Sequence, residues 1–252
     1  MRVGVIGSGG RMGSSVCRAV AADEGMTLSG SVDPQGGSAS LDALVDAGAE
    51  VAVDFTVPSA AVANAEWCAA HGIHCVIGTT GLDDAGLGRL GVAFPEAGPL
   101  GCVVAPNFAI GAVLMMRFAA LAAPWFETAE IIELHHDAKI DAPSGTALRT
   151  AALIEAASSQ WAPDPTEKEV VGGARGGVLP GGSVHVHSVR LRGLVAHQEV
   201  LFGTTGQTLS IRHDTTDRES FMPGVLLAVR AVAGAPGRPG LTVGLEHLLG
   251  LG

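Results

Sequence analysis

Residues 2–13 read RVGVIGSGGRMG, in which a short β-branched run leads directly into a stretch rich in glycine. Gly7, Gly10 and Gly13 have the spacing G-x-x-G-x-x-G, a variant of the dinucleotide-binding fingerprint, and a helical pattern follows from residue 11 to residue 22. Between a strand and a helix, such glycines let the backbone turn tightly and approach a pyrophosphate, whose charge the N–H groups of the helix start can bind. This stretch therefore predicts a Rossmann-type fold, and the simpler alternative is a tight turn with a capping glycine.

Strand and helix patterns alternate through the first part of the chain, which is typical of a parallel sheet with helices on both faces. The expected strands cover residues 2–6, 27–32, 51–55, 74–77 and 101–105, and the expected helices cover residues 11–22 and 58–70. After Pro106 the pattern changes to a long apolar helix ending near residue 122, a strand at 129–135 and an Ala-rich helix at 146–157.

The later part of the chain is typical of a second sheet. Residues 159–183 are interpreted as a loop, and the alternating runs 184–191, 195–202 and 208–213 follow without intervening helices. A helix at 220–233 is expected to return to the first domain. We therefore predict an α/β protein with an N-terminal Rossmann-type parallel-sheet domain (residues 1–106 and 216–252). We expect its C-terminal α+β domain (107–215) to have a mixed or antiparallel sheet and to bind the substrate.

Charge and hydrophobicity exclude several classes of partner. The formal net charge of −10 argues against nucleic acid or an anionic membrane as a partner, since both attract basic surfaces. No apolar run reaches the roughly 18–20 residues of a membrane span. The sequence starts directly with a strand pattern and leaves no room for a secretory signal, so we expect a cytoplasmic protein.

Cysteines and histidines raise the question of a metal, and we expect none. The cysteines have no CxxC spacing and are interpreted as reduced structural thiols: Cys17, Cys68, Cys75 and Cys102. Cys68, His71, His74 and Cys75 form a cluster whose spacing is unlike a zinc site. His185 and His187 alternate on an expected strand and share a face, where a metal is the less favoured alternative to a packed or solvated strand.

The loops after the expected strands complete a candidate cofactor site. Asp33 ends the second strand, where a carboxylate can accept the ribose hydroxyls, and loops after later strands line the ligand crevice of a doubly wound sheet. Asp33 disfavours a 2′-phosphate, and Pro34 follows it in place of an arginine, whereas Arg11 can offset a phosphate, so we expect both NADH and NADPH to bind. For the later loops, ordinary turns are the alternative. The predicted cofactor-binding residues are Gly7, Ser8, Gly9, Gly10, Arg11, Met12, Gly13, Asp33, Gly78, Thr79, Thr80, Ala105, Pro106, Asn107 and Phe108.

Residues 133–147, ELHHDAKIDAPSGTA, contain the candidate reaction site. His135 and Lys139 lie close to the expected strand end, and histidine is the side chain whose ordinary pKa suits proton transfer near neutral pH. An S-G-T turn then starts a helix, where N–H groups can bind an anion. A histidine pair alone is more often structural, but this combination predicts a carboxylate cradle beside a titratable acid. The predicted substrate-binding residues are His136, Ser144, Gly145 and Thr146.

Together, GSGGRMG at 7–13, GTTG at 78–81, APNFAIG at 105–111 and HHDAKIDAPSGTA at 135–147 resemble the dihydrodipicolinate reductase family. The likeness covers nearly the whole chain. It implies NAD(P)H-dependent reduction of 4-hydroxy-tetrahydrodipicolinate, a small dicarboxylate, to tetrahydrodipicolinate with loss of water, in the diaminopimelate route to lysine. It also implies a homotetramer whose C-terminal sheets pack together.

The resemblance further implies roles for individual residues. His135 transfers a proton, Lys139 is a proton donor that contacts the substrate, and His136 with Gly145 and Thr146 binds the carboxylates. Some family members have another histidine at the position of Ala138, and its absence here is expected to alter only the surroundings. Further candidates for ligand contacts are Arg190, Arg212 and Arg218.

Two other functions remain as alternatives. Another NAD(P)-dependent dehydrogenase of similar architecture would keep the glycine loop but lack the segment 135–147. A non-catalytic NAD(H) sensor would add a DNA-binding or partner surface, against which the net charge and the lack of a basic helix count.

Overall fold

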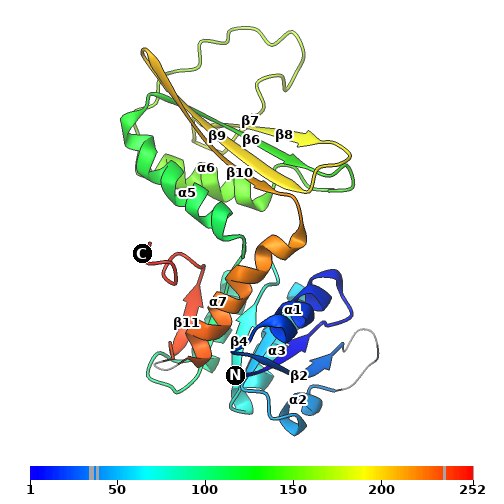
Figure 1. Ribbon diagram of the computed structural model, residues 1–252. Coiled ribbons are helices and arrows are strands. Elements are labelled where there is room, and N and C mark those ends of the chain that lie inside the picture. The colour runs from blue at the N-terminus through cyan, green and yellow to red at the C-terminus, as the bar shows by residue number, and fades with distance from the viewer. Residues whose placement is uncertain (34–36, 38–39, 235–236, 252) are drawn as a thin grey trace. The chain divides into compact units, whose positions relative to one another are not determined.

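The chain forms two compact units, which are drawn in Figure 1. The computed structural model describes residues 1–33, 37, 40–234 and 237–251, so that Pro34 lies outside the described residues. The first unit contains Met1–Ile110 and Arg218–Gly252, and the second contains Gly111–Asp217. The boundaries expected from the sequence lie a few residues from these, and the second unit is an insertion in the chain of the first.

The first unit contains a six-stranded parallel sheet in the order β11-β5-β4-β3-β1-β2. Strands β1, β3, β4 and β5 are buried over most of their length, as their continuous apolar runs predict, whereas the edge strands β2 and β11 are partly exposed. The carboxyl ends of β1 to β5 all meet at one edge of this sheet, because the strands are parallel. The strands are β1 (Arg2–Ile6), β2 (Thr27–Val32), β3 (Val51–Asp54), β4 (His74–Ile77), β5 (Gly101–Val104) and β11 (Gly240–Val243).

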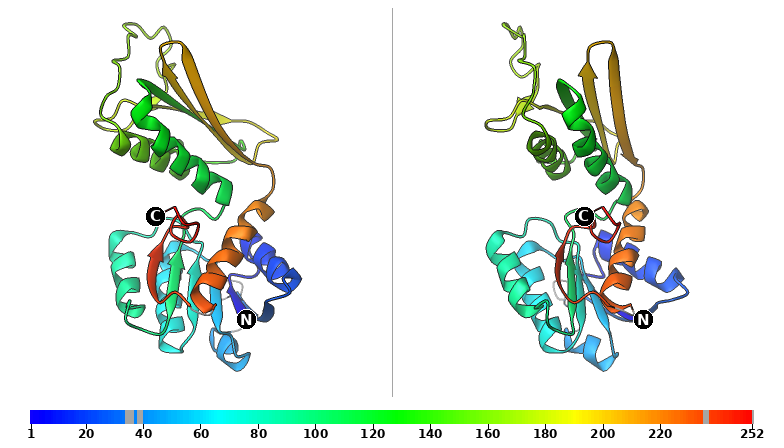
Figure 2. Two further views of the ribbon diagram at one scale, coloured as in Figure 1. Left: turned by 60° about the vertical axis from the view of Figure 1, so that its left-hand side comes forward. Right: turned by 90° about the vertical axis from the view of Figure 1, so that its left-hand side faces the viewer.

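Helices cover both faces of the parallel sheet (Figure 2). α1 (Arg11–Ala22) and α7 (Met222–Ala233) pack together on one face, and α3 (Pro58–Ala70) and α4 (Asp84–Ala93) pack on the other. Two short helices complete the unit, α2 (Asp42–Asp46) and η2 (Arg218–Phe221). None of the helices in the described residues is long and apolar enough to cross a membrane.

Three elements of the first unit were not predicted: α2, α4 and β11. α4 contains Gly86, Gly88 and Gly91, which lower helix propensity and hide its pattern. Tertiary contacts stabilise it nevertheless, because Leu90 is buried against α3 and the Asp83 side chain accepts a hydrogen bond from the Gly86 N–H at 2.8 Å. β11 is short and begins at a glycine, so its pairing with β5 could not be inferred locally.

The second unit contains a mixed sheet in the order β10-β9-β6-β8-β7, as the predicted fold class requires. β6 and β8 are parallel, and the other neighbours are antiparallel. The expectation that residues 159–183 are entirely loop was wrong at one place. The two-residue strand β7 lies in this segment and pairs with β8 at the edge of the sheet. The strands are β6 (Thr128–His135), β7 (Gly177–Val178), β8 (His185–Arg190), β9 (Ala196–Thr204) and β10 (Gln207–Thr215).

One face of this mixed sheet is covered by α5 (Ile110–Ala122) and α6 (Gly145–Ala157), as Figure 2 shows. The short helix η1 (Ala123–Trp125) follows α5. Side chains alternate along β6, so that Ile131 and Glu133 are buried on the helix-covered face, whereas Glu130 and Ile132 lie on the opposite face. His135 ends β6 and lies opposite Arg190 of β8 in the strand register.

The four cysteines are free thiols. Cys68, Cys75 and Cys102 are fully buried in α3, β4 and β5, and Cys17 in α1 is partly exposed. Burial raises the pKa of the Cys17 thiol, and a hydrogen bond with Cys75, together with burial, raises that of Cys68. These thiols therefore act as small apolar packing groups of the first unit.

Candidate active site

The glycine stretch forms a tight turn that joins β1 to α1. Gly7 has a φ of +82°, a left-handed conformation that other residues rarely adopt, and its N–H donates to the Val32 carbonyl at 2.8 Å. A Cβ atom at Gly13 would overlap the Gly7 carbonyl oxygen, so only glycine lets the first turn of α1 lie directly on this loop. The turn is thus fixed to the carboxyl end of β2 as well as β1.

The start of α1 has the features of an anion site. Its N-cap is Gly10, whose lack of a side chain leaves the approach to the first-turn N–H groups open. The carboxylate of Asp33 lies against Gly9, where even a Cβ atom would overlap it. Backbone donors and a positive dipole end therefore lie next to a carboxylate, the combination that suits a pyrophosphate joined to a ribose.

The loops after β4 and β5 meet the same sheet edge. Thr79 is 6% exposed, and its Oγ1 has no hydrogen-bond partner within the described part of the chain. Phe108 is buried and packs on Phe55, with ring centroids 5.9 Å apart. Phe55 was not singled out in the sequence, although its place directly after β3 was a signal, and its ring fills the space beside Gly78. An orphaned polar atom beside a side-chain-free glycine turn fits a bound dinucleotide.

In the second unit, His135 is held by an acidic side chain two residues earlier on the same strand. The His135 Nδ1 lies 2.5 Å from Oε2 of Glu133, which is fully buried, and the His135 side chain is 15% exposed. Burial lowers the pKa of His135, and nearby Lys139 and Arg190 act in the same direction, against the raising effect of the Glu133 carboxylate. A histidine with a lowered pKa therefore ends β6.

Lys139 lies close enough to influence His135 and has an acidic partner of its own. Its Nζ donates to both carboxylate oxygens of Asp141, at 2.7 and 2.9 Å, and this interaction lowers the pKa of Asp141. His136, between them in sequence, is partly exposed. His135 and Lys139 thus lie near enough to each other within the second unit for the Lys139 charge to act on His135.

The helix start after this loop has the predicted cap. Ser144 is buried, and its Oγ accepts a hydrogen bond from the Ala147 N–H at 3.2 Å, while Gly145, the first residue of α6, is exposed. One turn further, Thr150 accepts a hydrogen bond at 2.8 Å from Gln198, which lies opposite Glu133 in the register of β6 and β9. The start of α6 is thereby fixed beside the carboxyl end of β6.

Two side chains that interact with the candidate site residue His135 were not predicted from the sequence to do so. Glu133 was given no role, although the E-x-H spacing on a strand places it on the same face as His135. Arg190 was named only as a possible ligand contact. It instead points inward, donating to Glu133 Oε1 at 2.8 Å, to Glu133 Oε2 at 3.0 Å and to the Asp141 carbonyl at 2.6 Å.

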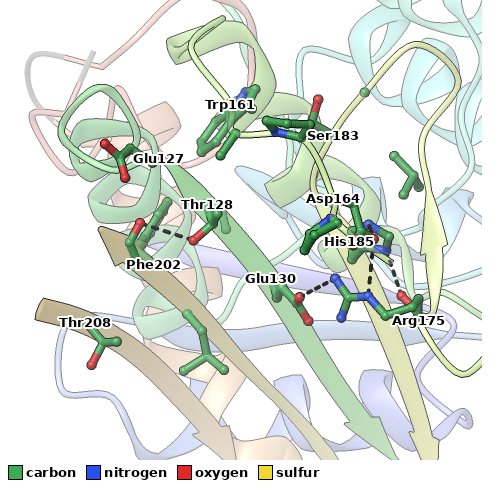
Figure 3. Close-up of a pocket in the computed structure, with 18 residues that line it drawn as sticks. Glu127, Thr128, Glu130, Trp161, Asp164, Arg175, Ser183, His185, Phe202 and Thr208 are labelled. Atoms are coloured by element: carbon green, nitrogen blue, oxygen red, sulfur yellow. Dashed lines mark hydrogen bonds and ion pairs between the residues drawn. The ribbon is translucent and has the colours of Figure 1, made fainter. Parts of the chain in front are cut away.

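His185 and His187, the alternating pair, lie in a network of protein groups on the other face of β6. Figure 3 shows His185 beside Asp164 and Arg175. His187 Nε2 is 2.8 Å from Glu130 Oε2, and His185 Nε2 is 3.1 Å from Asp164 Oδ2. Arg175 bonds both acids, at 2.7 Å to Glu130 and 3.3 Å to Asp164. A cavity of about 620 Å³ adjoins this network at the amino end of β6, whereas His135 is at the carboxyl end.

The histidines of the Cys–His cluster at residues 68–75 also contact neighbouring protein groups. The His71 ring stacks on Trp67 with centroids 3.9 Å apart, and His74 Nδ1 accepts a hydrogen bond from the Gly101 N–H at 2.9 Å. Over the residues that the structure describes, no group of three or more His, Cys, Asp or Glu side chains is arranged to hold a metal ion.

The parallel sheet and its glycine turn define a dinucleotide-binding protein of the Rossmann class. Residues 1–108 match the family model described as dihydrodipicolinate reductase, N-terminus, and residues 111–249 match the C-terminus of the same family. The chain therefore belongs to the dihydrodipicolinate reductase family, and it is an NAD(P)H-dependent reductase.

Relatives are similar over their full length. The 4-hydroxy-tetrahydrodipicolinate reductase of Cutibacterium acnes is 54% identical and covers 100% of this chain and 99% of its own. That of Streptomyces coelicolor is 51% identical over 100% of this chain and 98% of its own. Among solved structures, a dipicolinate-bound dihydrodipicolinate reductase from Paenisporosarcina sp. TG-14 is 40% identical, with a TM-score of 0.86 over 98% of both chains.

Proposed function

We propose that this chain reduces 4-hydroxy-tetrahydrodipicolinate to tetrahydrodipicolinate, with loss of water and oxidation of NADH or NADPH, in the diaminopimelate route to lysine. Family membership over the whole chain supports this substrate. The observation that carries the proposal is the group at the end of β6: His135 backed by a buried carboxylate, Lys139 beside it and the capped start of α6. A cation and N–H donors suit the binding of a dicarboxylate, and a proton-transfer group suits its reduction.

On the cofactor side, the first unit would hold the dinucleotide with the residues predicted for it. The glycine turn and the α1 start bind the pyrophosphate, Asp33 accepts from the ribose, and the loops after β4 and β5 adjoin the nicotinamide. A bound reduced nicotinamide supplies the hydride. We expect NADH and NADPH to be used within about tenfold of each other, because Asp33 and Arg11 act in opposite directions. A preference above about a hundredfold in kcat/KM would contradict this balance.

On the substrate side, the second unit would supply binding and protons. The Lys139 ammonium and the N–H groups of Gly145 and Thr146 bind carboxylates, with His136 as a further donor. With substrate bound, the Lys139 ammonium would contact both the substrate carboxylate and Asp141. Without substrate, Asp141 orients the Lys139 side chain. His135 exchanges a proton with the substrate through Nε2, since Nδ1 faces Glu133.

Coupled turnover tests this function. Purified protein is mixed with pyruvate, aspartate semialdehyde and the synthase that condenses them, and NADH absorbance is followed. Oxidation of NADH that depends on the synthase supports the proposal. Oxidation that instead depends on another hydroxy or amino acid would favour a different dehydrogenase, and binding of NADH without any turnover would favour a sensor.

Pyridine-2,6-dicarboxylate, a planar dicarboxylate, tests the site itself. We expect it to compete with substrate and to bind at least about tenfold more weakly to Lys139→Ala and Thr146→Pro, which lose a cation and a backbone N–H respectively. Lys168→Ala removes a lysine from the segment between α6 and β7, and Thr146→Ala keeps the backbone N–H, so both serve as matched controls. Unchanged affinity in both test variants would place the carboxylate cradle elsewhere.

We also propose that the protein is a cytoplasmic homotetramer in which the second unit provides the contacts between subunits. The sheet face opposite α5 and α6 carries partly exposed Ile132, Leu134 and Leu201, and free cysteines are typical of a reducing compartment. Light scattering would measure the mass, and cell fractionation the location. A monomer at assay concentration would contradict the assembly.

A further inference from the structure

A carboxylate with no solvent exposure lies directly behind His135. Glu133 is 0% exposed, and transferring an ionised carboxylate into such a place is costly unless its oxygens are satisfied. Both oxygens have partners, because Arg190 of the neighbouring strand donates to each of them and His135 Nδ1 adds a third contact at 2.5 Å. The group is therefore built as a fixed anion.

A fixed anion determines which nitrogen of His135 carries hydrogen. Burial alone would raise the pKa of Glu133, but hydrogen bonds from Arg190, Ser188 and His135 lower it below its ordinary value, so the carboxylate is ionised near neutral pH. An ionised carboxylate can only accept, which requires Nδ1 of His135 to be the donor. The Nε2 atom is left as the position that takes up or releases a proton.

The same arginine reaches the loop that carries Lys139. Arg190 donates to the Asp141 carbonyl at 2.6 Å, and the Asp141 carboxylate accepts from Lys139 Nζ. The ion pair of Glu133 with Arg190 thus contacts His135 through Glu133 and contacts Asp141, the partner of Lys139, through Arg190. Arg190 comes from β8, 57 residues after Glu133 in sequence, and its position opposite His135 in the sheet register makes these contacts possible.

We propose that Glu133 is a positioning residue that fixes the Nδ1–H tautomer and the orientation of His135, and that Arg190 links it to the Lys139 loop. The proposal rests on the proposed function of His135 as the proton-transfer group. Glu133 itself does not touch substrate; it acts through His135.

Wild-type protein provides the first test, which involves no risk of misfolding. Nitrogen-15 NMR of histidine-labelled protein reports which imidazole nitrogen is protonated, and the His135 signals are identified by their loss in His135→Gln. We expect a protonated Nδ1 and an unprotonated Nε2 at a pH above the pKa of His135. The opposite tautomer would overturn the proposal.

A matched pair of variants provides the second test. Glu133→Gln should lower kcat by about a hundredfold or more and change the KM of substrate much less, because the Arg190 contact with the Asp141 carbonyl is not removed. The Kd of NADH, which binds to the first unit, should change by less than about threefold. Glu130→Gln is the control, since Glu130 lies on the other face of the same strand and also contacts a histidine and an arginine. Its kcat should stay within about twofold of wild type.

The pH profile distinguishes positioning from a structural role. The charged groups that act on His135 are Glu133 on its own strand, Lys139 in the following loop and Arg190 on β8. Removing the carboxylate leaves two cations beside the imidazole, which lowers its pKa further. If His135 is a general acid, the alkaline loss of kcat should therefore move to lower pH in Glu133→Gln, and an unmoved profile would count against positioning.

The double variant separates this inference from the proposed function. Because Glu133 acts through His135, adding Glu133→Gln to His135→Gln should cause no further loss of kcat beyond about threefold. An additive loss would show that Glu133 acts independently, and the proposal would fail. If instead His135→Gln alone keeps full activity, the proposed function of His135 is wrong, whatever the tautomer measured in the wild type.

Discussion

Strand β6 carries two glutamate-centred networks on opposite faces, built from the same residue types in different surroundings. Glu133 contacts His135 and Arg190 and is fully buried. Glu130 contacts His187 and Arg175 and is 34% exposed, and its arginine comes from the segment between α6 and β8 instead of from a neighbouring strand. The two networks thus differ in solvent access and in what holds the arginine.

This difference shows that burial determines how much an ion pair contributes to stability and to the orientation of its partners. Removing one partner of a buried pair leaves an uncompensated charge and costs about 3–5 kcal/mol, whereas exposed pairs contribute about 0–1 kcal/mol. The Glu133 network therefore fixes the geometry of its histidine, while the Glu130 network is a surface contact that water and salt can replace. The following predictions test this contrast, from the largest expected effect to the smallest.

The largest contrast, in kcat, is expected when His135 and His187 are each replaced by glutamine. We expect His135→Gln to lower kcat by about 10²–10⁴ with NADH binding nearly unchanged, because proton transfer is lost and the first unit is untouched. His187→Gln should leave kcat within about twofold of wild type, since that side chain faces Glu130. Steady-state kinetics and NADH fluorescence measure both. Equal losses would mean that the face of β6 does not separate the two histidines.

Stability should show the next largest contrast. Glu133→Gln should lower the free energy of unfolding by about 3 kcal/mol or more, because Arg190 loses a bidentate partner. Glu130→Gln should cost less than about 1 kcal/mol. Urea unfolding followed by circular dichroism measures the difference. If the two variants unfold at the same urea concentration, burial is not what distinguishes the networks.

The pH dependence of stability sharpens the same contrast. The pKa of Glu133 is lowered in the folded protein, so its stabilisation is fully present above the unfolded value of about 4.3 and is lost as pH falls toward the folded pKa. The difference in unfolding free energy between wild type and Glu133→Gln should therefore shrink as the medium is acidified below that value. The pKa of Glu130 is also lowered, by Arg175 and His187 acting against burial, and the same sign with a smaller amplitude is expected there. A difference that grows on acidification would contradict the assignment.

The smallest effect is expected at Asp164, at the outer end of the Glu130 network. Hydrogen bonds from Thr166 and Arg175 lower the pKa of Asp164 to about 2. Its contacts are thus present above the ordinary aspartate value of about 3.9 and are lost only as pH falls through about 2. A carbon-13 NMR titration should find the Asp164 carboxyl still ionised at about pH 3.5, and Asp164→Asn should leave kcat unchanged. An ordinary titration near 3.9 would mean that the network is not formed in solution.

The fold was largely predictable because its signals are local. A β-branched run, a glycine turn and a helical pattern in residues 2–22 determine the first β-α unit, and their order predicts a parallel sheet. The elements that were missed depend on distant partners. β11 forms a strand because it pairs with β5. α4 is stabilised by burial of Leu90 and Phe94 in spite of its glycines.

The candidate site was predictable to the same extent. Ser144 as an N-cap and the closeness of His135 to Lys139 follow from spacing along the chain, and the structure has both. The partnership of Glu133 with Arg190 depends on the register of β6 against β8, which sequence periodicity does not determine. Sequence therefore indicated the candidate substrate-binding groups but not the ion pair of Glu133 with Arg190 beside them.

The insertion of the second unit between residues 110 and 218 has a consequence for biogenesis. Residues 111–217 form a contiguous unit, which is entirely synthesised before the ribosome reaches α7 and β11. The parallel sheet cannot be completed at that moment, because its edge strand β11 and the helix that packs on β3, β4 and β5 are still missing. Domains generally fold as units during synthesis. The inserted unit is thus the first that can reach its native state on the ribosome, and the nascent first unit exposes an unpaired β5 edge until translation has passed residue 243.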